Sequence, residues 1–462
     1  MSPQEKDLKV PAPPPEQPLS NAKVPSQKFP WIDPQVRYRL WQTLRHLPLP
    51  WRFRLGIDRW SRSFLFPELT RIFEKDEGPS QILFVSETLP FPDLNSGDLR
   101  LSNILKATIQ AGFQISFVSV LEYDLYFLRL SNPKDIERYE ESIRVLGIKR
   151  LFYGVNALEK ELHSRPGTFR SAFVSFPQVA EKVIPVLKKL DPGIRIIYDM
   201  VDSHSLRFRR EATLTNDPAV LRKADRYEKL EASAARSSDM TIAVSTNDQE
   251  EILRVAPGTN VSLISNYFDI PPQPDPVPKN RSHLLFVGGF RHIPNIDAVE
   301  WFVREVFPLI RRSNPDLIFH IAGSNAPQTI LDMSNIKGVI VHGWVPDLSL
   351  LFQHSRVFMA PLRYGAGVKG KIGQALSFGL PVVTTSIGAE GLDLITGLHC
   401  EIADTPQEIA TAVNRLLIDD THWTTLSKHG REHIVHNFST EVLQKKIVSL
   451  FSPEVTKIDQ AG

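Results

Sequence analysis

The stretch MAPLRYGAGVKGKIGQALSFGLPVVTT, residues 359–385, decides the fold of this chain. An apolar run that ends near residue 362 predicts a strand, the glycines after it predict a turn, and the next residues predict a helix over 368–378. A second apolar run at 381–386 predicts the next strand. Strands that are apolar throughout and alternate with helices are typical of a parallel sheet covered by helices on both faces.

The same alternation of short apolar strands and longer helical patterns extends through both halves of the chain. It runs over 81–270 and again over 281–437, and the segment PPQPDPVP, which begins at Pro271, separates the two halves. The five prolines of this segment exclude a helix or an inner strand, so 271–280 is predicted to be a linker. We therefore expect an α/β protein with two doubly wound, Rossmann-like domains. Such sheets bind ligands at their carboxyl edges, which here would face a central cleft.

The composition excludes several classes of protein. The chain has 462 residues, of which 42% are hydrophobic and 23% are charged, as in ordinary globular proteins. Its 54 basic and 52 acidic side chains nearly balance, which gives no reason to expect nucleic acid as a partner. Cys400 is the only cysteine, which fits a reducing compartment. No apolar stretch reaches the ~20 residues that span a bilayer, and the first residues lack the apolar core of a secretion signal, so we expect a cytoplasmic location.

Residues 1–80 differ from the rest of the chain. They begin with a Pro-rich tail and continue into a basic, Trp-rich extension, in which residues 28–75 hold ten basic, four acidic and four Trp side chains. Two interpretations of the extension stay open. It is either a peripheral contact with an anionic membrane surface, with Trp at the level of the headgroups, or a helical segment whose tryptophans pack on the first domain.

The Gly-rich turn is the first candidate for chemistry. Gly365, Gly367 and Gly370 let the chain pass close to a ligand, and the helix start that follows offers backbone N–H groups to an anion. Lys369 and Lys371 add two positive charges at the helix end whose dipole disfavours cations. This arrangement indicates an anion site; the alternative is that both lysines face solvent.

The same glycines match the motif G-x-G-x-x-G, which raises the hypothesis of a dinucleotide-dependent oxidoreductase. That motif requires an acidic residue about 20 positions further on, at the end of the next strand, where it holds a ribose. Here the strand ends in Thr384, Thr385 and Ser386, and Glu390 lies beyond it in a loop. The context therefore disfavours a dinucleotide site.

Six stretches of the sequence together match the pattern of one known family. They are LLFVGGFRHIPNIDAVEWF (284–302), the run 343–376, GLPVVTTSIGAEGL (379–392), LPFPDLNSGDLRLSNIL (89–105), YDMVDSHSLRFRRE (198–211) and ISNYFD (264–269). In these stretches the chain resembles the retaining glycosyltransferases of family 4 (glycosyl transferases group 1), which have the GT-B fold. The resemblance covers roughly residues 81–450, and 343–392 is its most specific part.

The resemblance implies transfer of a sugar from a nucleotide-sugar donor, with retention of configuration and without a metal or other cofactor. Lys369 and Lys371 would hold the donor diphosphate, which would itself act as the base toward the acceptor. Glu390 would lie near the donor, and Gly97 would let the backbone of the first domain approach the donor phosphates. The transferred sugar would meet the backbone N–H groups of Gly365, Ala366, Gly367 and Val368.

Several positions depart from the family pattern. Many members carry two glutamates eight positions apart around the donor-binding helix, and here these positions read Ala366 and Gln374. Gln374 is able to hydrogen-bond a ribose hydroxyl through its amide. An Arg and a Lys after the first strand of the second domain are also missing, although Arg291 and His292 are close enough to substitute. These departures keep a second hypothesis open: a catalytically weak GT-B protein that binds a nucleotide sugar or glycan for a partner.

The first domain would supply the acceptor side of the cleft. His204 resembles the His that family members place near the donor sugar, and with Lys369 and Lys371 it completes the candidate catalytic set; the alternative is a loop His without a role. Asp202 and Arg207 are candidate acceptor contacts, and Arg207 is otherwise a solvated side chain. The remaining acceptor candidates, Asp98 and Arg100, are otherwise helix-capping groups.

The resemblance also assigns roles to the parts of the chain. Residues 81–270 would form the acceptor-side domain and 281–437 the donor-binding domain, and 438–462 would hold a closing helix that crosses back to the first domain, followed by a tail. The expected activity is transfer to a glycan or lipid-linked acceptor in polysaccharide biosynthesis.

Overall fold

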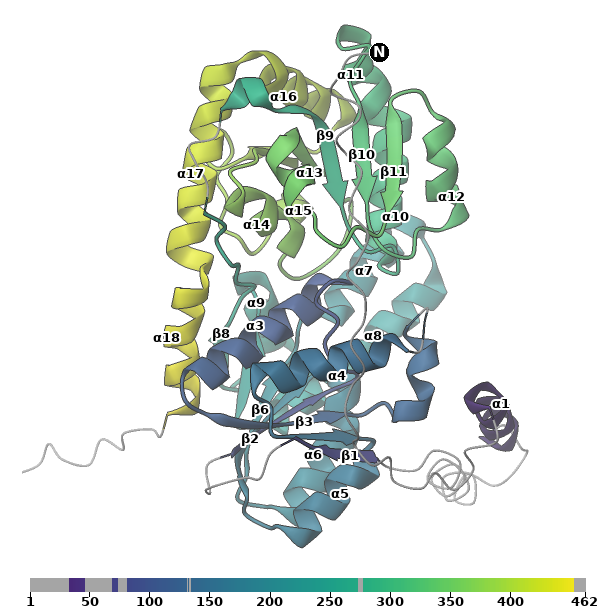
Figure 1. Ribbon diagram of the computed structural model, residues 1–462, viewed down its shortest axis with the longest axis vertical. Helices are drawn as coiled ribbons and strands as arrows, with labels where there is room; N and C mark the ends of the chain where they lie inside the picture. The colour runs from purple at the N-terminus through teal and green to yellow at the C-terminus, as the bar shows by residue number, and fades with distance from the viewer. Residues whose placement is uncertain are drawn as a thin grey trace, which may run out of the picture. The chain divides into compact units, whose positions relative to one another are not determined.

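The computed structural model describes residues 33–45, 69–73, 81–130, 132, 134–272 and 277–452 (Figure 1). The chain divides into two units, Met1–Pro67 and Glu68–Gly462. The described part of the first unit is helix α1 (Pro34–Arg45), on which Trp41 is buried. The other tryptophans of the extension, Trp31, Trp51 and Trp60, lie outside the described residues, so membrane contact through 28–75 stays a prediction. Among the described helices, none combines the length and the apolar character needed to cross a bilayer.

The first domain is built on a sheet with the strand order β1-β4-β3-β2-β5-β6-β7-β8. All neighbouring strands pair in parallel except β1, which is antiparallel to β4. Its strands are β1 (Leu69–Ile72), β2 (Gln81–Ser86), β3 (Gln114–Ser119), β4 (Arg150–Tyr153), β5 (Phe169–Ser175), β6 (Arg195–Asp199), β7 (Met240–Ala243) and β8 (Val261–Leu263). Its helices are α3 (Ser96–Gln110), α4 (Asp135–Leu146), α5 (Val155–Ser164), α6 (Pro177–Leu190), α7 (His204–Thr215), α8 (Pro218–Arg236) and α9 (Thr246–Val255), with a 3-10 helix at Tyr123–Leu128.

The second domain is built on a wholly parallel sheet with the strand order β11-β10-β9-β12-β13-β14. Its strands are β9 (Ser282–Val287), β10 (Phe319–Ala322), β11 (Val339–Gly343), β12 (Ser355–Ala360), β13 (Val382–Thr384) and β14 (Glu401–Ile402). Its helices are α10 (Ile293–Trp301), α11 (Phe307–Ser313), α12 (Gln328–Leu331), α13 (Ser349–His354), α14 (Gly370–Ser377), α15 (Ser386–Ala389), α16 (Pro406–Ile418) and α17 (Asp420–Phe438), with a π-helical turn at Phe302–Val306 and 3-10 turns at Pro278–Asn280 and Asp332–Asn335.

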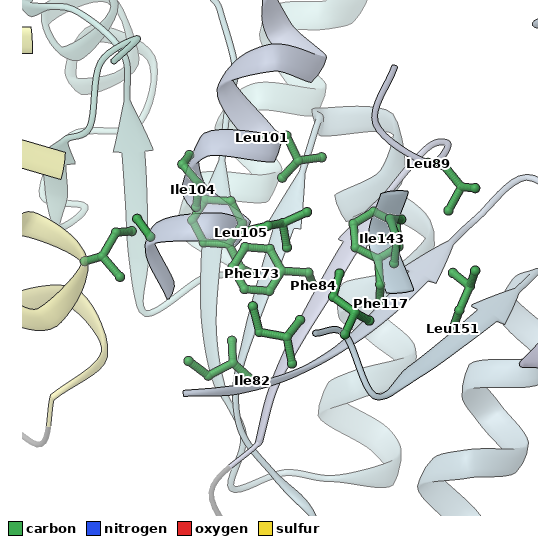
Figure 2. Close-up of a cluster of buried hydrophobic side chains, with 14 of the residues drawn as sticks. Ile82, Phe84, Leu89, Leu101, Ile104, Leu105, Phe117, Ile143, Leu151 and Phe173 are labelled. Atoms are coloured by element: carbon green, nitrogen blue, oxygen red, sulfur yellow. The ribbon is translucent and has the colours of Figure 1, made fainter. Parts of the chain in front are cut away.

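Burial on both faces explains why the central strands are apolar throughout. In β2, Ile82 and Phe84 belong to one hydrophobic cluster, and Leu83 and Val85 belong to the cluster on the opposite face. A strand covered on one face only would alternate apolar with polar residues. Figure 2 shows the first of these clusters, in which side chains of α3 pack over Phe84 and Phe173.

The last helix, α18 (Thr440–Phe451), follows α17 of the second domain but buries its apolar face in the core of the first. The ring of Phe451 lies 5.7 Å from that of Phe113, 6.1 Å from that of Phe84 and 6.4 Å from that of Phe173, between centroids. Nη1 of Arg195 on β6 donates a hydrogen bond of 2.6 Å to the carbonyl oxygen of Leu450. Helix α18 therefore links the chain of the second domain to the first sheet.

The α/β class with two Rossmann-like sheets is confirmed, and the differences from prediction are local. Strand β1 lies upstream of residue 81, where the first domain was expected to begin; its four residues are too few to show a pattern. Helix α14 begins at Gly370 rather than at 368. Helices α10 and α11 are joined by a π-helical turn at Phe302–Val306.

The packing of α18 generates a stability prediction. Replacement of Phe451 by Ala removes a ring that is 2% exposed, and we expect it to lower the free energy of unfolding by about 3–4 kcal/mol. Val448→Ala on the same helix is the matched control, because its side chain is 45% exposed; we expect a change within about 0.5 kcal/mol. Urea unfolding followed by intrinsic fluorescence measures both. Equal effects of the two substitutions would show that α18 does not contribute to the core.

Candidate functional site

The Gly-rich turn between β12 and α14 packs directly against the first domain. A Cβ atom added to Gly367 would lie 2.8 Å from the Cβ of Asp202, and one added to Gly370 would lie 2.9 Å from the Cβ of Ser96. Gly367 also has a φ of +66°, which residues other than glycine rarely adopt. These glycines therefore permit the two domains to meet, a role that sequence analysis did not assign to them.

Lys369 precedes α14 as its N-cap residue, and its side chain is buried. Its Nζ donates a hydrogen bond of 2.7 Å to the carbonyl oxygen of Gly367 and lies 3.6 Å from Oε2 of Glu390. Burial lowers the pKa of Lys369, and the charge of Glu390 offsets part of that effect. Lys369 is thus an internal cation of the turn and does not face open solvent.

Lys371, in the first turn of α14, has a different environment. Its Nζ donates a hydrogen bond to Oδ1 of Asn295 and lies 4.5 Å from the centre of the Phe286 ring. Among the described residues, no carboxylate forms an ion pair with it. The side chain is half-buried, and loss of hydration, followed by repulsion from Lys369, lowers the pKa of Lys371 to about 7. An anion that bound here would restore the charge of Lys371 and relieve its repulsion from Lys369.

Arg210 and Glu390 form an ion pair between the two domains. Arg210, on α7, donates to Oε2 of Glu390 at 2.7 Å and to Oε1 at 2.8 Å, and its Nη1 donates to the carbonyl oxygen of Gly365 at 2.7 Å. A two-bond contact between a guanidinium and a carboxylate fixes both groups in orientation as well as distance. Glu390 therefore lies beside Lys369, close to the predicted donor position, with an arginine partner already in place.

Asp202 connects the candidate residues of the first domain. One carboxylate oxygen accepts a hydrogen bond of 2.7 Å from Arg207, and the other lies 2.9 Å from Nδ1 of His204. Burial alone would raise the pKa of Asp202, but the neighbouring Arg207 and His204 outweigh burial and lower it. Asp202, His204 and Arg207 thus form one hydrogen-bonded group at the carboxyl end of β6, and Asp202 lies next to Gly367.

Two further carboxylates hold the start of α7 in place. Glu231 accepts hydrogen bonds of 2.6 Å from the backbone N–H of His204 and from the hydroxyl of Ser205. Asp248 accepts one of 3.0 Å from the backbone N–H of Ser203. Burial raises the pKa of Glu231 to about 7, and its hydrogen bonds with Ser205 offset part of that effect.

The two residues proposed to replace the missing Arg and Lys have separate locations. Arg291 donates a hydrogen bond to the carbonyl oxygen of Arg129 in the first domain. His292 is exposed, and partial loss of hydration, together with the charges of Arg207 and Lys371, lowers the pKa of its imidazole below the ordinary value. His292 is therefore neutral at pH 7 and lies within the electrostatic range of the lysines, so it offers a polar group without adding charge.

Arg100 is not available for the acceptor contact predicted for it. Its side chain is 3% exposed, and Nη1 donates a hydrogen bond of 2.9 Å to Oδ2 of Asp199. Its Nη2 donates one of 2.8 Å to the carbonyl oxygen of Ile264. Arg100 therefore ties α3 to the ends of β6 and β8 inside the first domain, and the physical reason is that its buried charge requires the carboxylate of Asp199.

Asp98 and Gly97 lie in the first turn of α3. The side chain of Asn95 caps the helix through the backbone N–H of Asp98 at 2.8 Å, and its amide donates to Oδ2 of Asp98 at 2.7 Å. Asp98 is 8% exposed, and burial raises its pKa to about 6. A Cβ atom added to Gly97 would lie 3.5 Å from Cγ1 of Val201. Gly97 and Asp98 thus both lie in the first turn of α3, directly after its N-cap residue Asn95.

The remaining predicted donor residues belong to the turn and to α14. The carbonyl oxygen of Val368 accepts a hydrogen bond of 3.0 Å from Nδ2 of Asn266 in the first domain, and that of Gly365 accepts one from Arg210. Ala366 and Gln374 are half-buried. The turn is thus held to the first domain through its carbonyl groups.

Sequence analysis missed the parts played by Arg210 and Asn295. Arg210 was one of three arginines after a predicted strand, and nothing in the local pattern separates it from Arg207 and Arg209. Asn295 lies in the segment, about Pro294–Asn295, where the resemblance would place a lysine, and its side chain accepts a hydrogen bond from Lys371. In the described part of the chain, no group of three or more His, Cys, Asp or Glu side chains is arranged to hold a metal ion.

One protein family matches the sequence of the second domain. Residues 281–419 match the family described as glycosyl transferases group 1. An uncharacterized 44.6 kDa protein in the cps region of Klebsiella pneumoniae is 30% identical over 131 residues, which are 26% of this chain and 34% of that protein. The match thus spans about a third of the length of that relative.

Comparison with solved structures extends the likeness to both domains. A sucrose-phosphate synthase from Thermosynechococcus elongatus has a TM-score of 0.61 at 16% identity and covers 80% of this chain and 98% of its own. HepE from Anabaena, in complex with UDP-glucose, has a TM-score of 0.59 at 14% identity, and the match covers 80% of this chain and 99% of HepE. A glycosyltransferase from Rickettsia africae has a TM-score of 0.58 at 11% identity and covers 81% and 98%. The chain therefore has the GT-B fold, and the family match supports a glycosyltransferase.

The environment of Lys371 generates a prediction about stability. Lys371→Met keeps the length of the side chain and removes a poorly compensated charge, so we expect the ligand-free protein to melt about 2 °C higher or more at pH 6. Because the folded-state pKa of about 7 lies below the ordinary value of 10.5, the cost of this charge is full below pH 7. It fades as the pH rises from 7 toward 10.5, and the difference in melting temperature should fade with it. Calorimetry at several pH values measures the difference, and a less stable variant at pH 6 would contradict this account.

A second prediction concerns the ion pair between the domains. We expect Arg210→Gln and Glu390→Gln to show a coupling energy of about 1–3 kcal/mol in a double-mutant cycle, because both side chains are less than a quarter exposed, at 24% and 17%. The control is the pair Arg304–Glu305, whose side chains are 68% and 49% exposed; its coupling should lie below about 0.5 kcal/mol. Additive effects of the two substitutions in the first pair would show that it does not join the domains.

Proposed function

We propose that the chain is a retaining, metal-independent glycosyltransferase that moves a hexose from a nucleotide-sugar donor to a glycan or lipid-linked acceptor. One observation carries the proposal: Lys371 is half-buried near Lys369 and, among the described residues, has no carboxylate partner, and the turn that precedes it packs against Asp202 of the other domain. A diphosphate is an anion of suitable charge for two lysines at a helix start. The family match of residues 281–419 agrees with this interpretation.

The proposed role of the lysines is to stabilise the departing diphosphate. Negative charge grows on the diphosphate as its bond to the sugar breaks, and cations already in place stabilise that charge without reorganisation. Lys371 would supply the charge from within α14, and Lys369 from its N-cap. These two cations and the N–H groups at the start of α14 would take the part that a divalent ion takes in other enzymes.

Retention would follow from the placement of the carboxylates. Asp202 and Glu390 each accept hydrogen bonds from an arginine, and this lowers the nucleophilicity of both carboxylates. We therefore propose that an oxygen of the leaving diphosphate takes the proton of the acceptor hydroxyl, which attacks from the same face. The proton moves to the diphosphate, the bond from sugar to phosphate breaks, and the new glycosidic bond keeps the configuration.

The acceptor would bind to the first domain beside Asp202 and Arg207. Arg207 is paired with Asp202, and its guanidinium lies 5.1 Å from the ring of Phe208. A carbohydrate offers both hydroxyl groups and apolar ring faces, which suit such a mixture of charged and aromatic groups. The Klebsiella relative is described as lying in a cps region, and on that ground we propose a cytoplasmic role in polysaccharide biosynthesis, with residues 28–75 as a candidate contact with the membrane that holds a lipid-linked acceptor.

A second candidate function is a GT-B protein that binds a nucleotide sugar for a partner with little turnover. Ala366 and Gln374 favour it, because they stand where many relatives of this pattern have glutamates. An amide bonds a ribose hydroxyl more weakly than a carboxylate does. Product formation, not binding, separates this candidate from the first.

The test of the proposed function combines binding with turnover. We expect one class among UDP-, GDP- and ADP-sugars to raise the melting temperature of the protein. We expect Lys371→Ala to weaken the binding of that class at least about tenfold, as measured by calorimetric titration. Lys279→Ala, at the solvent-exposed start of the second domain, is the matched control and should leave affinity unchanged. NAD and NADP should have no effect.

Turnover is then measured with the donor class that binds. Proton NMR of the product gives the anomeric configuration, and we expect retention and an unchanged rate in excess EDTA. Binding without product for any acceptor tested would favour the second candidate. Absence of binding to every nucleotide sugar would overturn both.

A further inference from the structure

Two strand ends of the first domain adopt the same unusual backbone conformation with different residues. Gly154 follows β4 and precedes α5 with φ 84° and ψ 150°. Phe176 follows β5 and precedes α6 with φ 75° and ψ 139°. This region of backbone space is used almost only by glycine, because a Cβ atom causes strain there. A phenylalanine at this turn therefore stays in a strained conformation that a glycine would adopt freely. The strain indicates that the phenylalanine ring has a role at this position.

The ring of Phe176 contacts the imidazole of His204. The two rings meet edge to face, with centroids 6.2 Å apart and planes at 89°. On another side, the imidazole stacks on the ring of Tyr227, with centroids 5.0 Å apart and planes at 13°. Tyr227 is itself held by Phe208, whose ring centre lies 5.3 Å away. His204 is thus fixed by two aromatic contacts, one from the turn after β5 and one from α8.

Hydrogen bonds fix His204 through its Nδ1 atom and its backbone N–H group. Nδ1 of His204 lies 2.9 Å from Oδ1 of Asp202 and 3.1 Å from the carbonyl oxygen of that residue, so Nδ1 is the nitrogen that donates. Glu231 accepts from the backbone N–H of His204. Among the described residues, Nε2 of His204 forms no hydrogen bond with a side chain or backbone group. In neutral His204, Nε2 is therefore the nitrogen that accepts a hydrogen bond from a ligand.

A second residue with a strained backbone, Val201, lies close to His204. Val201, between β6 and Asp202, has a φ of 67°, and a β-branched residue rarely adopts a positive φ. The turn of the second domain closes over Asp202, because a Cβ atom at Gly367 would lie 2.8 Å from it. Phe176 after β5 and Val201 after β6 are thus both strained, and both lie near His204, where the Gly-rich turn of the second domain meets the first domain.

We propose that Phe176 and Tyr227 are positioning residues that hold the imidazole of His204 so that Nε2 accepts a hydrogen bond from a hydroxyl of the transferred sugar. The inference rests on the proposed function for the identity of that ligand. The contact of the Phe176 ring with His204 explains why a strained phenylalanine stands after β5, where the equivalent turn after β4 has a glycine. The effect of both residues is exerted through His204, and neither contacts the reacting atoms.

The first experiment observes His204 in the ligand-free protein. Nitrogen-15 NMR of histidine side chains, assigned with His204→Gln, reports which ring nitrogen carries the proton. We expect a single Nδ1-protonated form in wild type, and a mixture of both forms in Phe176→Gly and in Tyr227→Leu. Phe176→Gly should fold, since Gly154 shows that glycine adopts this conformation. Tyr227→Phe is the matched control, because it keeps the stacked ring, and it should retain the wild-type signals.

The second experiment measures donor kinetics. We expect Phe176→Gly and Tyr227→Leu to lower kcat about tenfold while KM for the nucleotide sugar and Kd for UDP stay within about twofold. In a His204→Gln background, neither substitution should lower kcat further. Wild-type signals for His204 in both variants, or a further loss of kcat in the His204→Gln background, would overturn the proposal.

The two experiments separate this proposal from the proposed function. If no nucleotide sugar is turned over, the proposed function fails, and with it the sugar hydroxyl as the ligand of Nε2. The NMR measurement still decides whether Phe176 and Tyr227 orient His204, because it uses the ligand-free chain. If turnover occurs and the His204 signals do not respond, the proposed function stands and the positioning role is wrong.

Discussion

The half-buried ammonium group of Lys371 lies near a second lysine and has no ion-pair carboxylate among the described residues, and the rest of the site is organised around this uncompensated charge. Its contacts are the amide oxygen of Asn295 and the ring of Phe286, which hold a cation only weakly. Burial and the neighbouring Lys369 lower its pKa to about 7. Such an arrangement costs stability in the ligand-free protein, and a bound diphosphate would relieve that cost. Under the proposed function, the site would thus be preorganised for an anion at the expense of its own stability.

The two domains meet around this charge through contacts that leave little room for change. Glycines at 367 and 370 allow the turn of the second domain to touch Asp202 and Ser96. Arg210 then binds Glu390 and the carbonyl oxygen of Gly365, which places a carboxylate next to Lys369. Lys369 thus has an internal counter-ion and Lys371 has none, so the two lysines of the motif are electrostatically different although they are two positions apart. The first domain also contributes Asp202 and His204, whose positions depend on the strained turns after β5 and β6.

The sequence could predict the fold because its signals are local and repeated. Apolar runs such as 82–85 are buried on both faces, and this alone indicates parallel sheets under helices. The lysines of the Gly-rich turn were also accessible to sequence reasoning, since a cation at a helix start is unusual in itself. What could not be predicted depends on partners far away in the chain. Arg100 forms an ion pair with Asp199, 99 residues further on, and Arg210 forms one with Glu390, 180 residues further on. Neither pairing leaves a trace in local spacing.

The measurement that tests the central claim most directly is the proton uptake that accompanies UDP binding. Calorimetric titrations at pH 8 in two buffers of different ionisation enthalpy give the number of protons taken up per UDP, at a pH where the phosphates of UDP are already ionised. If Lys371 is the uncompensated cation of the site, wild type should take up close to one proton, and Lys371→Arg should bind UDP without uptake. UDP binding without proton uptake in wild type, or equal uptake in Lys371→Arg, would contradict the account.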